Sequence, residues 1–132
     1  MTAEGKHVGG CLCGAVRFEA TGPMRGFVAC HCGQCRKQSG HYPAFTNVPL
    51  DRFALTRQDG LRWYSASDRA QRGFCGDCGS FLFWRPQTRT HISISGGSFD
   101  GPTGGRIEKH IFCADKGDYY EIDDAVPHLA QW

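Results

Sequence analysis

The sequence has no long apolar run, no excess of charge of one sign and almost no helical periodicity. No stretch approaches the ~20 consecutive apolar residues that a membrane-spanning helix requires, and the first ten residues lack the apolar centre of a secretory signal peptide. The formal net charge of the 132 residues is only +2, which is too small to predict a polyanionic partner. We therefore expect a cytoplasmic protein that forms a single domain over residues 1–132.

Alternation of apolar and polar residues is the prevailing pattern, and this period is typical of strands. In Ala15–Ala20, for example, Val16 and Phe18 alternate with Arg17 and Glu19. The other expected strands lie at residues 53–56, 61–65, 81–84, 91–95 and 107–113. No window offers a helix of three turns, and we expect 33–39 to form one short helical turn. The sequence predicts a mainly β domain of many short strands.

Cysteine is abundant in this sequence, with eight residues, and it is the residue type that bears on function. In a chain without an export signal, clustered cysteines indicate metal binding rather than disulfides. Cys11 and Cys13 form one close pair, and Cys75 and Cys78 form another 62 residues later. Two such pairs can complete a tetrahedron of four thiolates around zinc. A closed site of this kind has no position for a substrate, so we interpret it as structural.

Cys30, Cys32 and Cys35 form a different kind of cluster. Three thiolates can hold one ion and leave its fourth position open, where water or a substrate thiol can bind. The spacing equally allows a closed site with a fourth protein ligand, and an iron–sulfur cluster is a less favoured third option. The candidates for that fourth ligand are His31, His41, His110 and Cys113. Cys113 is the strongest, because eight cysteines divide into two sites of four thiolates. His31 is disfavoured, because its side chain leaves an extended backbone on the opposite side from its neighbours.

The chain resembles the glutathione-dependent formaldehyde-activating enzyme family, which also includes centromere protein V. The matching segments are GGCLCGAVRFEATGP, CHCGQCRKQSG, GLRWYS, FCGDCGS and HIFCADKGDYYEI. The resemblance implies a β-tent fold of short antiparallel strands with two zinc ions. It makes Cys11, Cys13, Cys75 and Cys78 ligands of a structural zinc. It also makes Cys30, Cys32 and Cys35 the ligands of a catalytic zinc whose open position takes the sulfur of glutathione. Cys113 stands where the family usually has an apolar residue.

This resemblance implies a carbon–sulfur lyase that forms or cleaves a glutathione adduct such as S-hydroxymethylglutathione, or an adduct of another small thiol. Glutathione carries two carboxylates, and Arg36 and Lys37 are the cations nearest in sequence to the cysteine triple, although a solvated face is their commoner role. Asp123 and Asp124 are expected to form a solvated pair. The large aromatic residues are expected to belong to the core; they are Trp63, Tyr64, Phe81, Phe83 and Trp84.

Two other functions are compatible with the residues. One is a non-catalytic, zinc-stabilised binding module for protein or nucleic acid, although the basic residues are spread along the chain rather than gathered as nucleic-acid binding requires. The other is a redox or metal-handling protein in which the cysteine triple cycles. Metal content and the occupant of the fourth position at the second site would separate these functions from the lyase.

Overall fold

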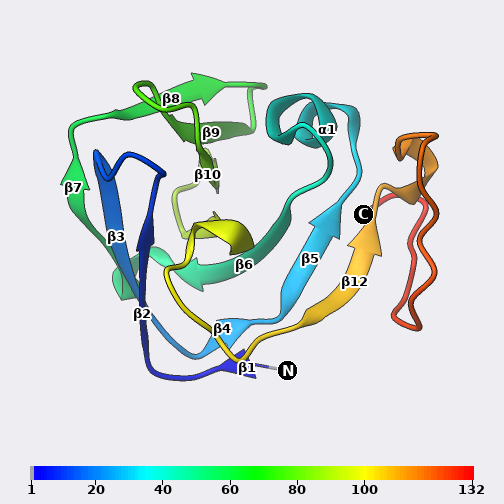
Figure 1. Cartoon of the computed structure of the whole chain (residues 1–132), viewed down its shortest axis with the longest axis horizontal. Coiled ribbons are helices and arrows are strands. Elements are labelled where there is room, and N and C mark those ends of the chain that lie inside the picture. Colours follow the sequence, from blue (N-terminus) through cyan, green and yellow to red (C-terminus); the bar gives the residue numbers. More distant parts are fainter. Residues whose placement is uncertain (1) are drawn as a thin grey trace.

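A computed structural model describes residues 2–132, and most of the regular structure consists of short strands (Figure 1). The strands are β1 (Thr2–Ala3), β2 (Lys6–Gly10), β3 (Val16–Thr21), β4 (Met24–Arg25), β5 (Phe27–Cys30), β6 (Ala44–Pro49), β7 (Phe53–Gln58), β8 (Leu61–Ser65), β9 (Ala70–Cys75), β10 (Phe81–Pro86), β11 (His91–Ser95) and β12 (Ile107–Ile111). The helical segments are α1 (Gly33–Ser39) and three single turns, η1 (Leu50–Arg52), η2 (Gly96–Ser98) and η3 (Cys113–Asp115). The prediction of a mainly β fold is confirmed.

Two sheets carry the architecture. Seven strands form the larger sheet in the order β12-β5-β6-β11-β10-β9-β8, and β2, β3 and β7 form the smaller one. All neighbours are antiparallel except β5 and β12, which run parallel. Figure 1 shows the smaller sheet on one side of the molecule, with β5 and β12 on the other. No helix in the described part of the chain is long and apolar enough to cross a membrane.

The main core lies where the two sheets face each other. Val16, Phe18 and Ala20 alternate inward along β3, as the sequence pattern predicts. The ring of Phe18 packs edge-on against that of Phe83 from β10, with centroids 5.4 Å apart. Burying such rings removes large apolar areas from water, and this contributes most of the stability of the core. Tyr64 does not join it: the expectation of a core position was wrong, because this residue of β8 is 60% exposed.

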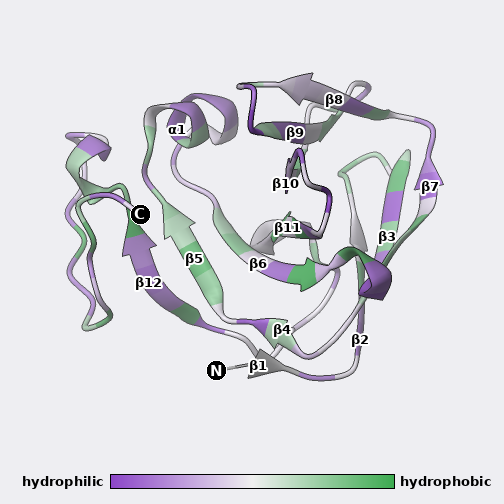
Figure 2. Cartoon of the chain, turned by 180° about the vertical axis from the view of Figure 1, so that it is seen from behind, coloured by the Kyte–Doolittle hydropathy of each residue, from purple (hydrophilic) through white to green (hydrophobic). Residues whose placement is uncertain are grey.

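The sequence pattern missed β5 for a physical reason. All four of its residues are buried, so the segment lacks the alternation of apolar and polar side chains by which a strand is recognised in a sequence. Figure 2 shows β5 in hydrophobic green beside the hydrophilic purple of its outer neighbour β12. A second, smaller apolar cluster forms around this strand; it contains Val28, Cys30, Cys35, Phe45 and Ile111.

Segment 33–39 is a seven-residue α-helix rather than a single turn. The Sγ of Cys32 accepts a hydrogen bond from the backbone N–H of Cys35, and this thiol therefore takes the place of the usual hydroxyl or carboxylate N-cap. Gly40 ends the helix with a φ of 86°, a left-handed conformation that glycine adopts without steric cost. Both helix ends are thus defined locally, which sets the position of the second and third cysteines of the triple.

The segment after β12 returns along the outside of the large sheet. The backbone N–H of Leu129 donates to the carbonyl of His110 at 2.9 Å, and that of Cys113 donates to the carbonyl of Leu129 at 3.0 Å. Figure 1 shows this segment in orange and red beside β12, at the edge of the molecule. The C-terminal residues are therefore joined to the strand that neighbours the cysteine triple.

Candidate functional site

Cys11, Cys13, Cys75 and Cys78 converge on one point between the two sheets. Their sulfur atoms all lie within 4.8 Å of one another, with Cys11 and Cys13 at 3.7 Å and Cys13 and Cys75 at 3.8 Å. A tetrahedral zinc ion with Zn–S bonds of about 2.3 Å separates its sulfurs by roughly 3.8 Å. The spacing and the all-thiol donor set therefore fit a closed four-thiolate zinc site.

Two loops bring this four-thiol group together. Cys11 and Cys13 follow β2, and the other pair occupies the tight turn between β9 and β10, where the N–H of Gly79 donates to the carbonyl of Cys75 at 2.8 Å. The Ser80 hydroxyl lies 3.3 Å from the Sγ of Cys78. This hydroxyl, followed by the backbone N–H of the same residue, lowers the pKa of the Cys78 thiol to about 5. Hydrogen bonds of this kind favour the thiolate, which is the form that binds metal.

Cys30, Cys32 and Cys35 form a second group, again with all sulfurs within 4.8 Å of one another. Cys30 ends β5, while the other two lie at the N-cap and within α1. The side chains of Cys30 and then Cys35 lower the pKa of the Cys32 thiol to about 2. The three thiols thus share hydrogen bonds in a way that stabilises negative charge on Cys32, and three soft donors fit zinc.

The fourth ligand that the spacing left open is not supplied by Cys113 or a histidine among the residues that the structure describes. The three-thiol group contains no further cysteine, histidine or acidic side chain within 4.8 Å. Cys113 lies half-buried in η3, and burial raises the pKa of its thiol. His31 turns away from the sulfurs, with its Nε2 2.8 Å from the Nδ1 of His110. Its ring is completely buried, and that burial lowers its pKa to about 4.

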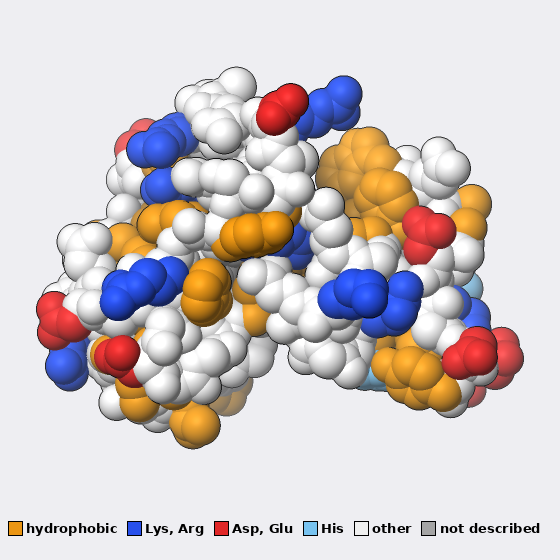
Figure 3. Space-filling view, turned by 90° about the horizontal axis from the view of Figure 1, so that it is seen from above, with side chains coloured by type: hydrophobic (Ala, Val, Ile, Leu, Met, Phe, Trp, Pro, Cys, Tyr) orange, Lys and Arg blue, Asp and Glu red, His pale blue; other side chains and the backbone are white. Residues whose placement is uncertain are grey.

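A cavity of about 700 Å³ opens over the three-thiol group. All three of its cysteines line the cavity, and most of the remaining wall is apolar or aromatic, including Trp84 and Trp132. Figure 3 shows a recess between the main body and the lobe at the right, with hydrophobic side chains inside it. A cavity of this size can enclose most of a small peptide-like ligand.

Three arginines give this thiol cavity its charge: Arg25, Arg69 and Arg72. Arg72 is only 5% exposed, donates to the Sγ of Cys35 at 3.4 Å, and keeps a buried Nε without a hydrogen-bond partner among the described residues. Burial lowers the pKa of Arg25. A buried cation with an unused donor is an unfavourable arrangement by itself and is suited to an anionic ligand.

The cations nearest in sequence to the cysteine triple are not those of the cavity. Arg36 and Lys37 follow the triple directly, but neither lines the cavity, and Lys37 is exposed on α1. Arg72 reaches the cysteines from β9, 37 residues along the chain. Arg72 lies between Gln71 and Gly73 in a segment that was not predicted as a strand, so no local pattern marked it.

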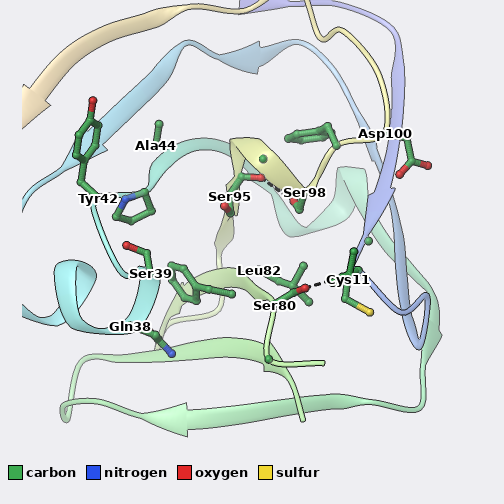
Figure 4. A pocket seen from close by; sticks show the side chains of 17 residues that line it. Cys11, Gln38, Ser39, Tyr42, Ala44, Ser80, Leu82, Ser95, Ser98 and Asp100 are labelled. Atoms are coloured by element: carbon green, nitrogen blue, oxygen red, sulfur yellow. Dashed lines mark hydrogen bonds between the residues drawn. The ribbon is translucent and has the colours of Figure 1, made fainter. Parts of the chain in front are cut away.

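A second cavity, of about 750 Å³, lies between the smaller sheet and α1. Figure 4 shows Ser39 and Gln38 of the helix region on one side, and Ser80 and Cys11 of the four-thiol loops on another. Its lining includes Cys11 but none of the three-thiol group. The hydroxyl of Ser98 is already satisfied, since it donates to the carbonyl of Ser95 at 2.6 Å. The cavity is therefore separate from the thiols that could bind a substrate.

Comparison with known proteins agrees with the geometry. Residues 6–115 match the family described as glutathione-dependent formaldehyde-activating enzyme. An uncharacterized lyase of Schizosaccharomyces pombe is 25% identical over 119 residues, which cover 89% of this chain and 85% of that protein. The crystal structure of a Rhodobacter sphaeroides protein aligns over 92% of this chain and 98% of its own, with a TM-score of 0.61 and 22% identity. The chain belongs to the glutathione-dependent formaldehyde-activating enzyme family.

Proposed function

We propose that this protein is a zinc-dependent carbon–sulfur lyase of a single domain, residues 1–132, which forms or cleaves an adduct of glutathione or a related thiol, such as S-hydroxymethylglutathione. The observation that carries the proposal is the three-thiol group at the base of an arginine-lined cavity, without a fourth protein donor in the described residues. Family membership and the name of the yeast relative agree with lyase activity. Eight cysteines in the free state suit the reducing cytoplasm.

Each of the two thiol groups has its own place in this proposal. Cys11, Cys13, Cys75 and Cys78 would hold a structural zinc ion. Cys30, Cys32 and Cys35 would hold a catalytic zinc ion, which supplies a fourth position where a substrate sulfur is kept as thiolate near neutral pH. Sulfur donors favour soft ligands, so this donor set suits thiol chemistry better than hydrolysis.

The chain itself binds and orients the substrate. The guanidinium groups of Arg25, Arg69 and Arg72 would pair with the two carboxylates of glutathione, and Trp84 and Trp132 would cover its apolar parts and exclude water. These contacts place the sulfur beside the thiol group and leave the other reactant to enter from the open side of the cavity. Orientation of this kind is the main contribution that we expect from the protein.

The reaction balances without an oxidant or reductant. In the forming direction the glutathione sulfur attacks the carbonyl carbon of formaldehyde, a C–S bond forms, and the thiol proton finishes on the aldehyde oxygen. A free thiol with a pKa of ~8.5 is already a few per cent ionised at neutral pH. Complete ionisation therefore contributes at most about two powers of ten, and positioning by the arginine-lined cavity supplies the rest.

NMR exchange spectroscopy with formaldehyde and glutathione tests the proposal directly. The variant is Cys32→Ser, because serine preserves the N-cap of α1 while it removes the thiolate. Cys113→Ser is the matched control, since its thiol lies outside both groups. We expect the wild-type protein and the control to accelerate exchange equally, and Cys32→Ser to lose about two powers of ten in rate. The proposal is wrong if the wild type gives no acceleration or if Cys32→Ser keeps it.

A further inference from the structure

A third cluster of metal-ligating atoms lies on the C-terminal segment, and it contains no cysteine. One nitrogen of His110, one nitrogen of His128 and a carboxylate oxygen of Asp124 all lie within 4.8 Å of one another. We propose that these residues form a third divalent-metal site, of the two-histidine, one-carboxylate type, that binds Zn²⁺ and closes the C-terminal segment onto β12. This inference does not depend on the lyase activity.

The backbone brings the two histidines together without any help from a metal. His110 and His128 form a parallel bridge: the N–H of His110 donates to the carbonyl of Pro127, and the N–H of Leu129 donates to the carbonyl of His110, each at 2.9 Å. The two imidazole rings meet edge to face with centroids 5.1 Å apart. Two ligands are therefore in place before an ion arrives, which reduces the entropy that binding must overcome.

Asp124 completes the set from the same segment. Its carboxylate oxygens lie 2.7 Å from the Nε2 of His110 and 2.8 Å from the Nε2 of His128. Asp123 and Asp124 are both exposed, as expected of a solvated pair, and the carboxylate of Asp124 also lies between the two rings.

The donor set and its spacing suit a borderline metal ion. Imidazole nitrogens and a carboxylate bind zinc at about 2.0–2.2 Å, so tetrahedral ligand atoms lie roughly 3.3–3.5 Å apart. The carboxylate must move outward by about half an ångström to admit the ion, and its side chain is 45% exposed and free to do so. Three protein ligands would leave one position for water, in a place that solvent reaches through Asp124 and His128.

The surroundings of His110 match those of a ligand residue. Its ring is 2% exposed, and its Nδ1 lies 2.8 Å from the Nε2 of His31. A second hydrogen bond of this type sets the tautomer and orientation of metal-bound histidines. A metal ion would take the place of the proton through which the Nε2 of His110 bonds to Asp124. The remaining proton of the ring would then lie on Nδ1 and be donated to the Nε2 of His31. His31 in turn is hydrogen-bonded through Nδ1 to the hydroxyl of Tyr120. These hydrogen bonds fix the orientation of the His110 ring toward the site.

Zinc titration of the full-length, zinc-containing protein by calorimetry tests the site. We expect wild-type protein to take up one equivalent of Zn²⁺ more than His128→Ala, and Asp124→Asn to bind that equivalent at least tenfold more weakly. The matched control is His7→Ala, whose imidazole bonds only to a backbone carbonyl and belongs to none of the three clusters. Equal uptake by wild type and His128→Ala would overturn the proposal. The three side chains would then only hydrogen-bond to one another and hold the C-terminal segment against β12.

A measurement on the wild-type protein covers the case of a variant that does not fold. In ¹⁵N-labelled protein, added Zn²⁺ should shift the Nε2 resonances of His110 and His128 together, and leave those of His7 unchanged. Shifts confined to other residues, or none at all, would refute the site. Neither experiment reads out glutathione chemistry, so the third metal site and the proposed lyase can fail separately.

Discussion

Loss of one cysteine from each thiol group should have very different consequences, and Cys75→Ala and Cys32→Ser are the pair that shows this. Cys75 is completely buried in the main core, where its sulfur belongs to the apolar cluster that unites the two sheets. Cys32 is half-buried at the start of α1 and borders only the smaller cluster. The first substitution thus acts on the contact between both sheets, and the second on one edge of the larger sheet.

The magnitudes decide the outcome. A structural zinc ion contributes about 10–16 kcal/mol to folding, while a whole domain is stable by only about 5–15 kcal/mol. Cys75→Ala removes one of four ligands and leaves a cavity against fully buried neighbours. We expect the free-energy cost of these two effects together to exceed the stability of the domain. Cys32→Ser keeps the helix cap and loses a ligand at the more open group, for which we expect a cost of roughly 1–3 kcal/mol.

Circular dichroism, thermal denaturation and metal analysis on the same preparations provide the assay. We expect Cys75→Ala to be unfolded or insoluble, and Cys32→Ser to remain folded with less bound zinc and a melting temperature lowered by about 5–15 °C. Cys113→Ser should keep both its zinc content and its melting temperature. If Cys75→Ala and Cys32→Ser lose the same stability, the division into a structural and a catalytic group is wrong.

Three further predictions concern the thiol cavity, the packing around the four-thiol group and metal removal. Arg72→Met should raise the KM for glutathione at least tenfold in steady-state assays, since a charge-assisted hydrogen bond contributes about 1.5–3 kcal/mol. Arg62 lies outside the cavity, so the control Arg62→Met should leave KM unchanged. Gly60→Ala would place a Cβ 2.8 Å from the Sγ of Cys75 and should lower the free energy of unfolding, measured in urea, by about 1–3 kcal/mol. As the control, Gly97→Ala meets no atom within 4 Å and should lower it by less than about 0.5 kcal/mol. A chelator added in steps should abolish activity before it unfolds the protein, because three thiolates hold zinc less firmly than four; simultaneous loss would contradict unequal sites.

Much of the fold was accessible from local patterns. Alternation identified β3, β7 and β11, and an aromatic-rich or apolar run indicated β8 and β10. β12 was also expected, whereas β2, β6 and β9 were not predicted. The same rule could not find β5, whose two faces are both covered. A strand that is buried along its whole length therefore leaves no alternation for a local pattern to detect.

The sequence by itself determined the two close cysteine pairs and the cysteine triple, because closely spaced cysteines lie near each other whatever the rest of the chain does. The meeting of Cys11 and Cys13 with Cys75 and Cys78 depended on the fold. Only the tertiary structure decided what surrounds them. The pairing of β9 with β10 carries Arg72 to Cys35, and the return of the C-terminal segment along β12 places Asp124 and His128 against His110. Contacts between residues so far apart in the chain depend on strand register and loop path, and short-range patterns contain no information about either.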